Sequence, residues 1–141
     1  LSRHEGDFPI RNQLIKPGDR WPLGVGAGAC AILAALSDVE IVDVLSRNAA
    51  LRAERFPRCT DEAMWQLIRE TRDKGYCTQP GLVIEGSWAV GVPVFDANNR
   101  PVASISIGAI ESRLGTARAA ALGNRLMQAS RELTALQAQA A

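Results

Sequence analysis

The stretch GVPVFDANNRPVASISIG, residues 91–108, places two β-type runs on either side of a polar turn. Because successive side chains of a strand point to opposite faces of its sheet, Ser104, Ser106 and Gly108 share one face of the second run. The two isoleucines between them point to the other face. The stretch therefore predicts an antiparallel hairpin with one apolar face and one face of small, polar residues. The polar face is either a solvated surface or the floor of a pocket.

Length and charge limit the class of protein. The chain has 141 residues, of which 47% are hydrophobic, and this suits one α/β or α+β domain with a full core. Its net charge is only +1, so we expect no direct binding to nucleic acid, which requires a basic surface. Apolar runs such as residues 29–36 are far shorter than the roughly 20 residues of a membrane span. We therefore expect a soluble domain without membrane contact.

The cysteines and the single histidine offer little for a metal site or for disulfides. Cys30, Cys59 and Cys77 are odd in number and form no C-x-x-C pair, a pattern typical of reduced thiols in the cytoplasm. His4 stands near a start that has neither an initiator Met nor a signal-peptide pattern. We expect a cytoplasmic fragment of a longer protein, with no metal and no cofactor.

Capping signals indicate where two helices begin. Ser37 is followed three residues later by Glu40, which is the pattern of a capping box. Thr60, followed by two acids, begins a second helix that ends at Gly75. The first of these helices would bury an apolar stripe made of Ile41, Val42, Leu45 and Ala49. The other predicted elements are strands at residues 8–15, 76–79 and 87–95, a helix over residues 29–36, and a long last helix from Gly115 or Thr116.

The last helix carries a heptad-like apolar seam, with spacings of three and four residues in alternation. The seam consists of Ala119, Leu122, Leu126, Ala129, Leu133 and Leu136. A helix of this kind either lies on the sheet of its own domain or contacts a second subunit, and the pattern is too short to decide between them.

The residues offer weak candidates for catalysis. The glycines between Leu23 and Ala29 lack the Lys-Ser/Thr of a phosphate loop, and suit instead a helix start whose backbone N–H groups face a small anion such as a carboxylate. A Cys or Ser nucleophile would need a base, and the only histidine is at the edge of the chain. Two sets of charges are typical of solvated helix faces. They are Asp61, Glu62, Glu70 and Asp73, and Arg47, Arg52, Arg55 and Arg58. We therefore expect no enzymatic activity.

Five short motifs, taken in order and spacing, carry a family resemblance over nearly the whole chain. They are Trp21-Pro22-Leu23, Gly75-Tyr76, Pro93-Val94-Phe95-Asp96, Ser104-Ile105-Ser106-Ile107 and Glu111-Ser112-Arg113-Leu114. Together they resemble the effector-binding domain of IclR-type transcriptional regulators. The resemblance implies an α+β domain over residues 1–141, with a GAF-like antiparallel sheet flanked by helices and a long C-terminal helix. It also implies that the start of the domain and an N-terminal winged helix-turn-helix lie outside this chain.

The resemblance also implies a pocket for a small carboxylate or aromatic acid. The implied lining residues are Ala27 and Gly28, Ser87 and Ala89, then Ser104, Ser106 and Gly108, with Trp21 and Gln79 as further positions. The chain departs from the family pattern at Gly24, Ala29-Cys30, Ala89 and Gly108, where many members carry other side chains. A pocket with fewer polar side chains should favour a larger or more apolar ligand than the smallest keto acids.

The resemblance also implies three kinds of partner. They are a small-molecule effector, further copies of the chain in a homodimer or tetramer, and DNA, which is bound only through the missing N-terminal domain. The bound effector would then modulate DNA binding by the full-length regulator. Two alternatives stay open at this point. One is a free-standing GAF-like sensor, and the other is an enzyme that uses a Cys or Ser nucleophile on a small acid or ester.

Overall fold

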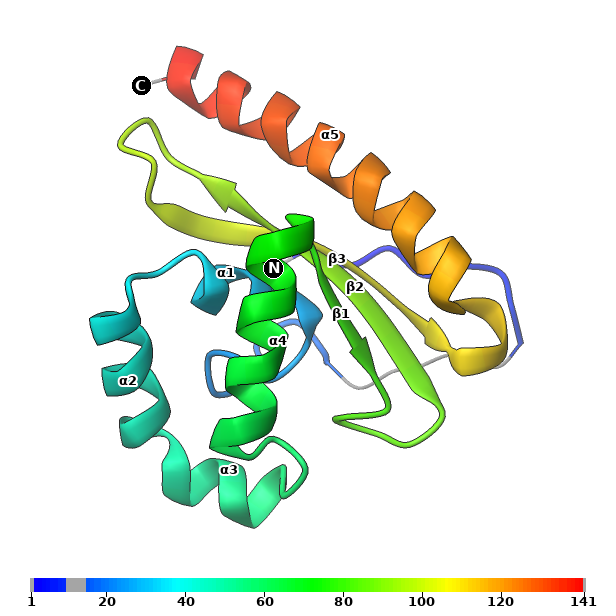
Figure 1. The fold of residues 1–141 in the computed structure, drawn as a ribbon. Coiled ribbons are helices and arrows are strands. Elements are labelled where there is room, and N and C mark those ends of the chain that lie inside the picture. Colours follow the sequence, from blue (N-terminus) through cyan, green and yellow to red (C-terminus); the bar gives the residue numbers. More distant parts are fainter. Residues whose placement is uncertain (1, 10–14, 141) are drawn as a thin grey trace.

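A computed structural model describes residues 2–9 and 15–140 of the chain (Figure 1). The described residues form an α+β fold, as the resemblance predicts. The elements, in chain order, are α1 (Ala27–Ala34), α2 (Asp38–Arg47), α3 (Ala49–Arg55), α4 (Asp61–Lys74), β1 (Cys77–Pro80), β2 (Ser87–Phe95), β3 (Pro101–Ile110), the 3-10 turn η1 (Glu111–Arg113) and α5 (Thr116–Ala140). Most of the predicted strand at residues 8–15 lies outside the described residues.

The three strands form an antiparallel sheet in the order β1-β2-β3. The predicted hairpin joins β2 to β3, and a bulge lies between Val94 and Phe95. Asp96 builds the turn, because its Oδ1 accepts hydrogen bonds from the backbone N–H groups of Asn98 and Arg100, at 2.9 and 2.8 Å. Asn99 takes a left-handed conformation with φ 58°, which Asn tolerates better than most residues.

Helices cover the two faces of the sheet, with α1 and α4 on one side and α5 along the other (Figure 1). The alternation of β2 separates the two cores. Ala89 packs against the buried cluster of α1 and α4. Val90 and Val92 are buried in a second cluster with Ala119 and Leu126 of α5. Each face of the sheet therefore contributes to its own hydrophobic core.

Both predicted helix caps are present. Ser37 accepts from the Glu40 N–H while the Glu40 carboxylate accepts from the Ser37 N–H, which completes the capping box. Thr60 accepts from the N–H of Ala63, and Gly75, with φ 83°, ends α4 in a left-handed conformation.

The helix that begins at Ser37 is shorter than predicted. It ends at Arg47, and α3 begins at Ala49, because Asn48 has non-helical dihedrals of φ −100° and ψ 3°. Ala49, beyond the break, is exposed, and Val42 within α2 is exposed as well, so Ile41 and Leu45 are the buried members of the predicted stripe.

One arginine of the predicted solvated set is buried, which corrects that expectation. Arg52 is 3% exposed, and its guanidinium donates to the carbonyls of Leu45 and Cys59, at 2.9 and 2.6 Å. It also pairs with the carboxylate of Asp61 at the start of α4. The arginine ties α2, α3 and α4 together through Nη1 and Nη2, which donate to the two carbonyls and to the counter-charge, while its Nε has no hydrogen-bond partner among the described residues. The other three arginines of the set are exposed.

The apolar seam of α5 is divided between two environments. Its first half packs on the sheet, where Ala119 and Leu126 are buried. Leu133 and Leu136, farther along, are 42% and 60% exposed. The first half of the seam therefore follows the first of the two predicted alternatives, in which the helix packs on the sheet of its own domain. Among residues 2–9 and 15–140, no helix is long and apolar enough to span a membrane.

Candidate functional site

The start of α1 presses directly onto the sheet, and glycine makes this approach possible. A methyl group on Gly91 of β2 would lie 2.6 Å from the backbone carbon of Ala27 and from the nitrogen of Gly28. A methyl group on Gly28 would in turn lie 2.6 Å from Ser104 Oγ and 3.4 Å from Ser106 Cβ. The structure thus brings together four of the predicted lining residues, which stand far apart in the sequence.

The first turn of α1 presents backbone N–H groups without a cap. Its N-cap is Gly26, at φ 92° and ψ 147°, which has no side chain to accept hydrogen bonds. No acidic residue occupies the first turn. The positive end of the helix dipole is therefore not offset locally, and an anion would be stabilised beside it.

The predicted residues of the sheet share the face that carries α1. We call this the serine face, defined by Ala89, Ser104, Ser106 and Gly108. Ser106 pairs with Gly91, and Gly108 pairs with Ala89, so the four residues occupy neighbouring rows on one side of β2 and β3. Both serines and Gly108 are exposed, while Ala89 is half-buried. A methyl group on Gly108 would meet only the carbonyl oxygen of Trp88, at 3.9 Å, so the space above this glycine is open.

Gln79 continues the row of Gly108 and Ala89 onto β1, because it pairs with Ala89. Its side chain is 3% exposed, and its Nε2 has no hydrogen-bond partner among the described residues. An unpartnered amide at this depth is rare in folded proteins.

Ser87 and Trp21 have other contacts. The Ser87 hydroxyl donates to the carbonyl oxygen of Ile84 at 2.6 Å, inside the loop between β1 and β2. The Trp21 ring packs against Phe56, with centroids 5.0 Å apart, beside the buried cluster of α1 and α4. Arg58 holds the same loop by donating to the Gly81 carbonyl at 2.8 Å and pairing with Glu85 at 3.2 Å.

The three cysteines are buried. The hydrogen bond that Cys30 donates to Cys77, and then burial, raise the pKa of the Cys30 thiol. The same hydrogen bond lowers the pKa of Cys77, against the opposing effect of its burial. Neither side chain has any exposed surface, so a substrate has no path to either sulfur. Burial also raises the pKa of Cys59. Among the described residues, no group of three or more His, Cys, Asp or Glu side chains is placed to hold a metal ion.

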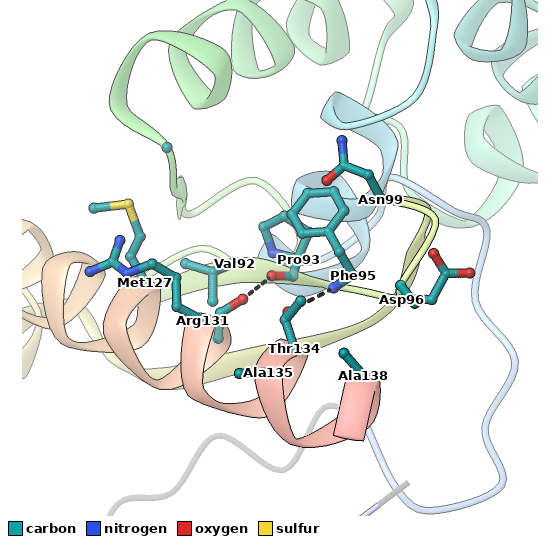
Figure 2. Close-up of a pocket in the computed structure, with 13 residues that line it drawn as sticks. Val92, Pro93, Phe95, Asp96, Asn99, Met127, Arg131, Thr134, Ala135 and Ala138 are labelled. Carbon is teal, nitrogen blue, oxygen red and sulfur yellow. Dashed lines mark hydrogen bonds between the residues drawn. The ribbon is translucent and has the colours of Figure 1, made fainter. Parts of the chain in front are cut away.

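A groove that the sequence did not indicate lies between α5 and the end of the hairpin (Figure 2). Its volume is about 540 Å³. Ser130 donates to the Pro93 carbonyl at 2.5 Å, and the Phe95 N–H donates to the hydroxyl of Thr134 at 3.3 Å, so polar bonds join the helix to β2 along the groove. The groove is separate from the serine face. The signal in the sequence that could have indicated it is the pair Ser130 and Thr134, two polar residues four positions apart beside the apolar seam.

Comparison with known proteins assigns the family. Residues 11–135 match the family described as bacterial transcriptional regulator IclR C-terminal. The chain is 27% identical over 123 residues to the HTH-type transcriptional regulator XynR of Escherichia coli (strain K12). That match covers 83% of this chain and 46% of XynR, so the chain spans about half the length of this curated relative.

Solved structures share the fold. The repressor BlcR of Agobacterium tumefaciens is similar with a TM-score of 0.76 at 23% identity, over 90% of this chain and 52% of that chain. The C-terminal domain of the E. coli transcriptional regulator KdgR is similar with a TM-score of 0.68 at 26% identity, over 84% of this chain and 72% of that chain. The family match extends over most of the sequence and agrees with the five motifs and with the α+β architecture. The chain belongs to the IclR family of bacterial transcriptional regulators and corresponds to their C-terminal domain.

Proposed function

We propose that this domain binds a small organic acid on the serine face, and that the bound acid modulates DNA binding by the full-length regulator. The observation that carries the proposal is the contact of the uncapped start of α1 with Ser104 and Ser106. Backbone N–H groups and hydroxyls that converge on one place are the donors that a carboxylate requires.

In this proposal, the carboxylate accepts hydrogen bonds from the backbone near Ala27 and Gly28 and from the Ser106 hydroxyl, with Ser104 close by. The apolar body of the acid lies over Gly108, where the structure leaves open space, and extends toward Ala89. Trp21, Gln79 and Ser87 remain proposed lining positions around this centre. Small residues on the floor favour an acid larger than the smallest keto acids.

The effect of the bound acid on DNA binding requires the longer protein. We propose that the chain functions in the cytoplasm as part of a homodimer or tetramer, whose geometry sets the spacing of DNA-reading helices. An acid that binds one geometry more tightly than another shifts the equilibrium between them. Sedimentation of the full regulator with and without ligand tests this arrangement, and a strict monomer in both states would contradict it.

A thermal-shift screen against aliphatic and aromatic carboxylates tests the binding proposal. A ligand at 100 times its Kd stabilises the native state by about 2.7 kcal/mol, which is readily measured. The matched amides of the same acids serve as controls, because they keep the apolar body and lose the charge. Stabilisation by amides and acids alike would refute a carboxylate site on the serine face.

A further inference from the structure

Two thiols that the proposed function does not use meet between α1 and β1. Cys30 donates a hydrogen bond to Cys77, although the two residues are far apart in the sequence. Neither side chain has any exposed surface. A buried cysteine packs as a small apolar residue, and a thiol is only a weak donor and acceptor, so two apolar side chains could fill this core equally well. The direct contact between the two sulfurs is therefore not required by the packing.

The register of the sheet explains why the two cysteines meet. Cys77 pairs with Gly91 of β2, and paired residues of neighbouring strands point to the same face. A methyl group on Gly91 would lie 2.6 Å from the backbone of Ala27, so this is the face that carries α1. Cys30 follows Ala27 by three residues and lies on the same side of the helix. The fold thus directs both cysteines into one contact.

The close approach of α1 to the sheet favours a covalent bond at this contact. The 2.6 Å separation and one further C–C bond of about 1.5 Å place the α1 backbone roughly 4 Å from the Cα atom of Gly91. A disulfide requires that its two Cα atoms lie within about 7 Å of each other. Because glycine removes the side chain that would hold the helix away, Cys30 can approach the neighbouring strand at Cys77 more closely than in ordinary packing of a helix on a sheet.

We propose that Cys30 and Cys77 are a modification site, at which a hydroperoxide forms an intramolecular disulfide that ties α1 to β1. In the cytoplasm proposed for this chain, disulfides are transient and typical of redox sensing. The disulfide would fix the helix whose start lies against the serine face. Its formation does not require an organic acid, so a failure of this inference leaves the proposed function untouched.

The oxidation takes two steps. The sulfur of the Cys77 thiolate attacks one oxygen of the peroxide, the O–O bond breaks, and the departing hydroxide takes up the proton that Cys77 lost and becomes water. Cys77 is then a sulfenic acid. The sulfur of Cys30 attacks the sulfur of Cys77, the S–O bond breaks, and the departing hydroxide leaves as water with the proton of Cys30. Each sulfur loses one electron, and the peroxide gains both.

The surroundings of the two sulfurs assign these roles. The hydrogen bond from Cys30, and then one from the Thr71 hydroxyl, lower the pKa of Cys77 against the effect of burial, and the thiolate is the nucleophile. The pKa of Cys30 is raised, so its thiol keeps the proton until the second step. Because neither sulfur is exposed, peroxide reaches them only when α1 opens locally, and we expect a slower reaction than at an exposed thiol.

Peptide mapping of the parent chain tests the pairing. The reduced chain is treated with hydrogen peroxide, its remaining thiols are alkylated in acid-quenched denaturant, and tryptic peptides are analysed by mass spectrometry without reduction. Trypsin cuts after Arg47 and Lys74, so the three cysteines fall in separate peptides. We expect a Cys30–Cys77 cross-link at least tenfold more abundant than any other pairing, with Cys59 alkylated, and dithiothreitol should restore both thiols.

The same treatment in urea is the control for the fold. In the unfolded chain the shorter loop favours a cross-link between Cys59 and Cys77, so the preference for Cys30 should disappear. Cys59→Ala should leave the native cross-link unchanged. Cys30→Ala should abolish it and leave a sulfenic acid at Cys77 that dimedone traps, whereas Cys77→Ala should yield no sulfenic acid at Cys30.

Three results would overturn the proposal. They are three intact thiols in the folded chain after the unfolded chain has been fully oxidised, a native cross-link that involves Cys59, and cross-links between chains only. All three are read from the parent chain, so the test does not depend on whether the variants fold.

Discussion

Single residues on the two faces of β3 should separate ligand binding from stability. Ser106→Ala removes one proposed hydrogen bond to a carboxylate, so affinity should fall roughly ten- to hundredfold, or about 1.5–3 kcal/mol, with folding intact. Ile105→Ser should instead lower the free energy of unfolding by about 1–2 kcal/mol, since Ile105 packs into the α5 cluster. Calorimetry and urea denaturation measure the two effects. If Ser106→Ala binds like the parent while Ile105→Ser stays stable and loses the ligand, the two faces have been assigned in reverse.

Gly91, which pairs with Ser106, and Gly108 of the serine face offer a second contrast at this scale. Gly91→Ala should destabilise the domain by about 1–3 kcal/mol, because the new methyl group would meet the backbone of Ala27 and Gly28, which cannot yield without moving α1. Gly108→Ala should fold normally, because its methyl group enters open space. It should weaken acid binding, since the group would occupy the proposed floor. Equal stability of the two variants, measured by urea denaturation, would contradict the close approach of α1.

At the scale of an element, the capping box of α2 makes stability depend on pH. The Glu40 carboxylate accepts hydrogen bonds from the N–H and the hydroxyl of Ser37 and then from Arg100, and these bonds lower its pKa from 4.5 to about 2. Because the folded pKa is the lower one, the stabilisation is complete above about 4.5 and is lost as the pH falls toward 2. Glu40→Gln should therefore be less stable than the parent at neutral pH, and the difference should close between these two values. A difference in melting temperature that is the same at pH 7 and pH 2 would contradict this linkage.

At the scale of the whole molecule, the chain should not recognise DNA by itself. Its net charge of +1 provides little attraction to phosphates, and it spans about half the length of its curated relative. Fluorescence anisotropy with operator and scrambled duplexes at moderate salt should show no sequence-specific binding by the chain. Specific binding with sub-micromolar affinity would contradict this expectation and would mean that the domain itself contains a DNA-binding surface.

Local signals in the sequence determined most of the elements. The capping box at Ser37, the cap at Thr60 and the alternation from Ser104 to Gly108 each depend on neighbours within a few positions. The structure therefore begins α2 and α4 at their predicted caps and places β3 over the alternating run. The break at Asn48 was missed, because no Gly or Pro marks it and the helical period runs through it. The predicted parity of β3 also placed both serines on one face, since alternation is a property of any strand.

The tertiary structure alone decided how distant segments meet. Three features show this: Gly28 contacts Ser104, Arg52 is buried against Asp61, and the Gln79 amide nitrogen is buried without a partner among the described residues. No local pattern in the sequence indicates any of them. Each depends on strand register and on the packing of α1 and α4, which are set by the total burial of apolar surface and the pairing of buried polar groups. The sequence by itself therefore determined most of the elements, the family and the polar face of β3. The tertiary structure placed the start of α1 against this face and the buried Gln79 amide beside it on β1, because long-range packing brings those segments together.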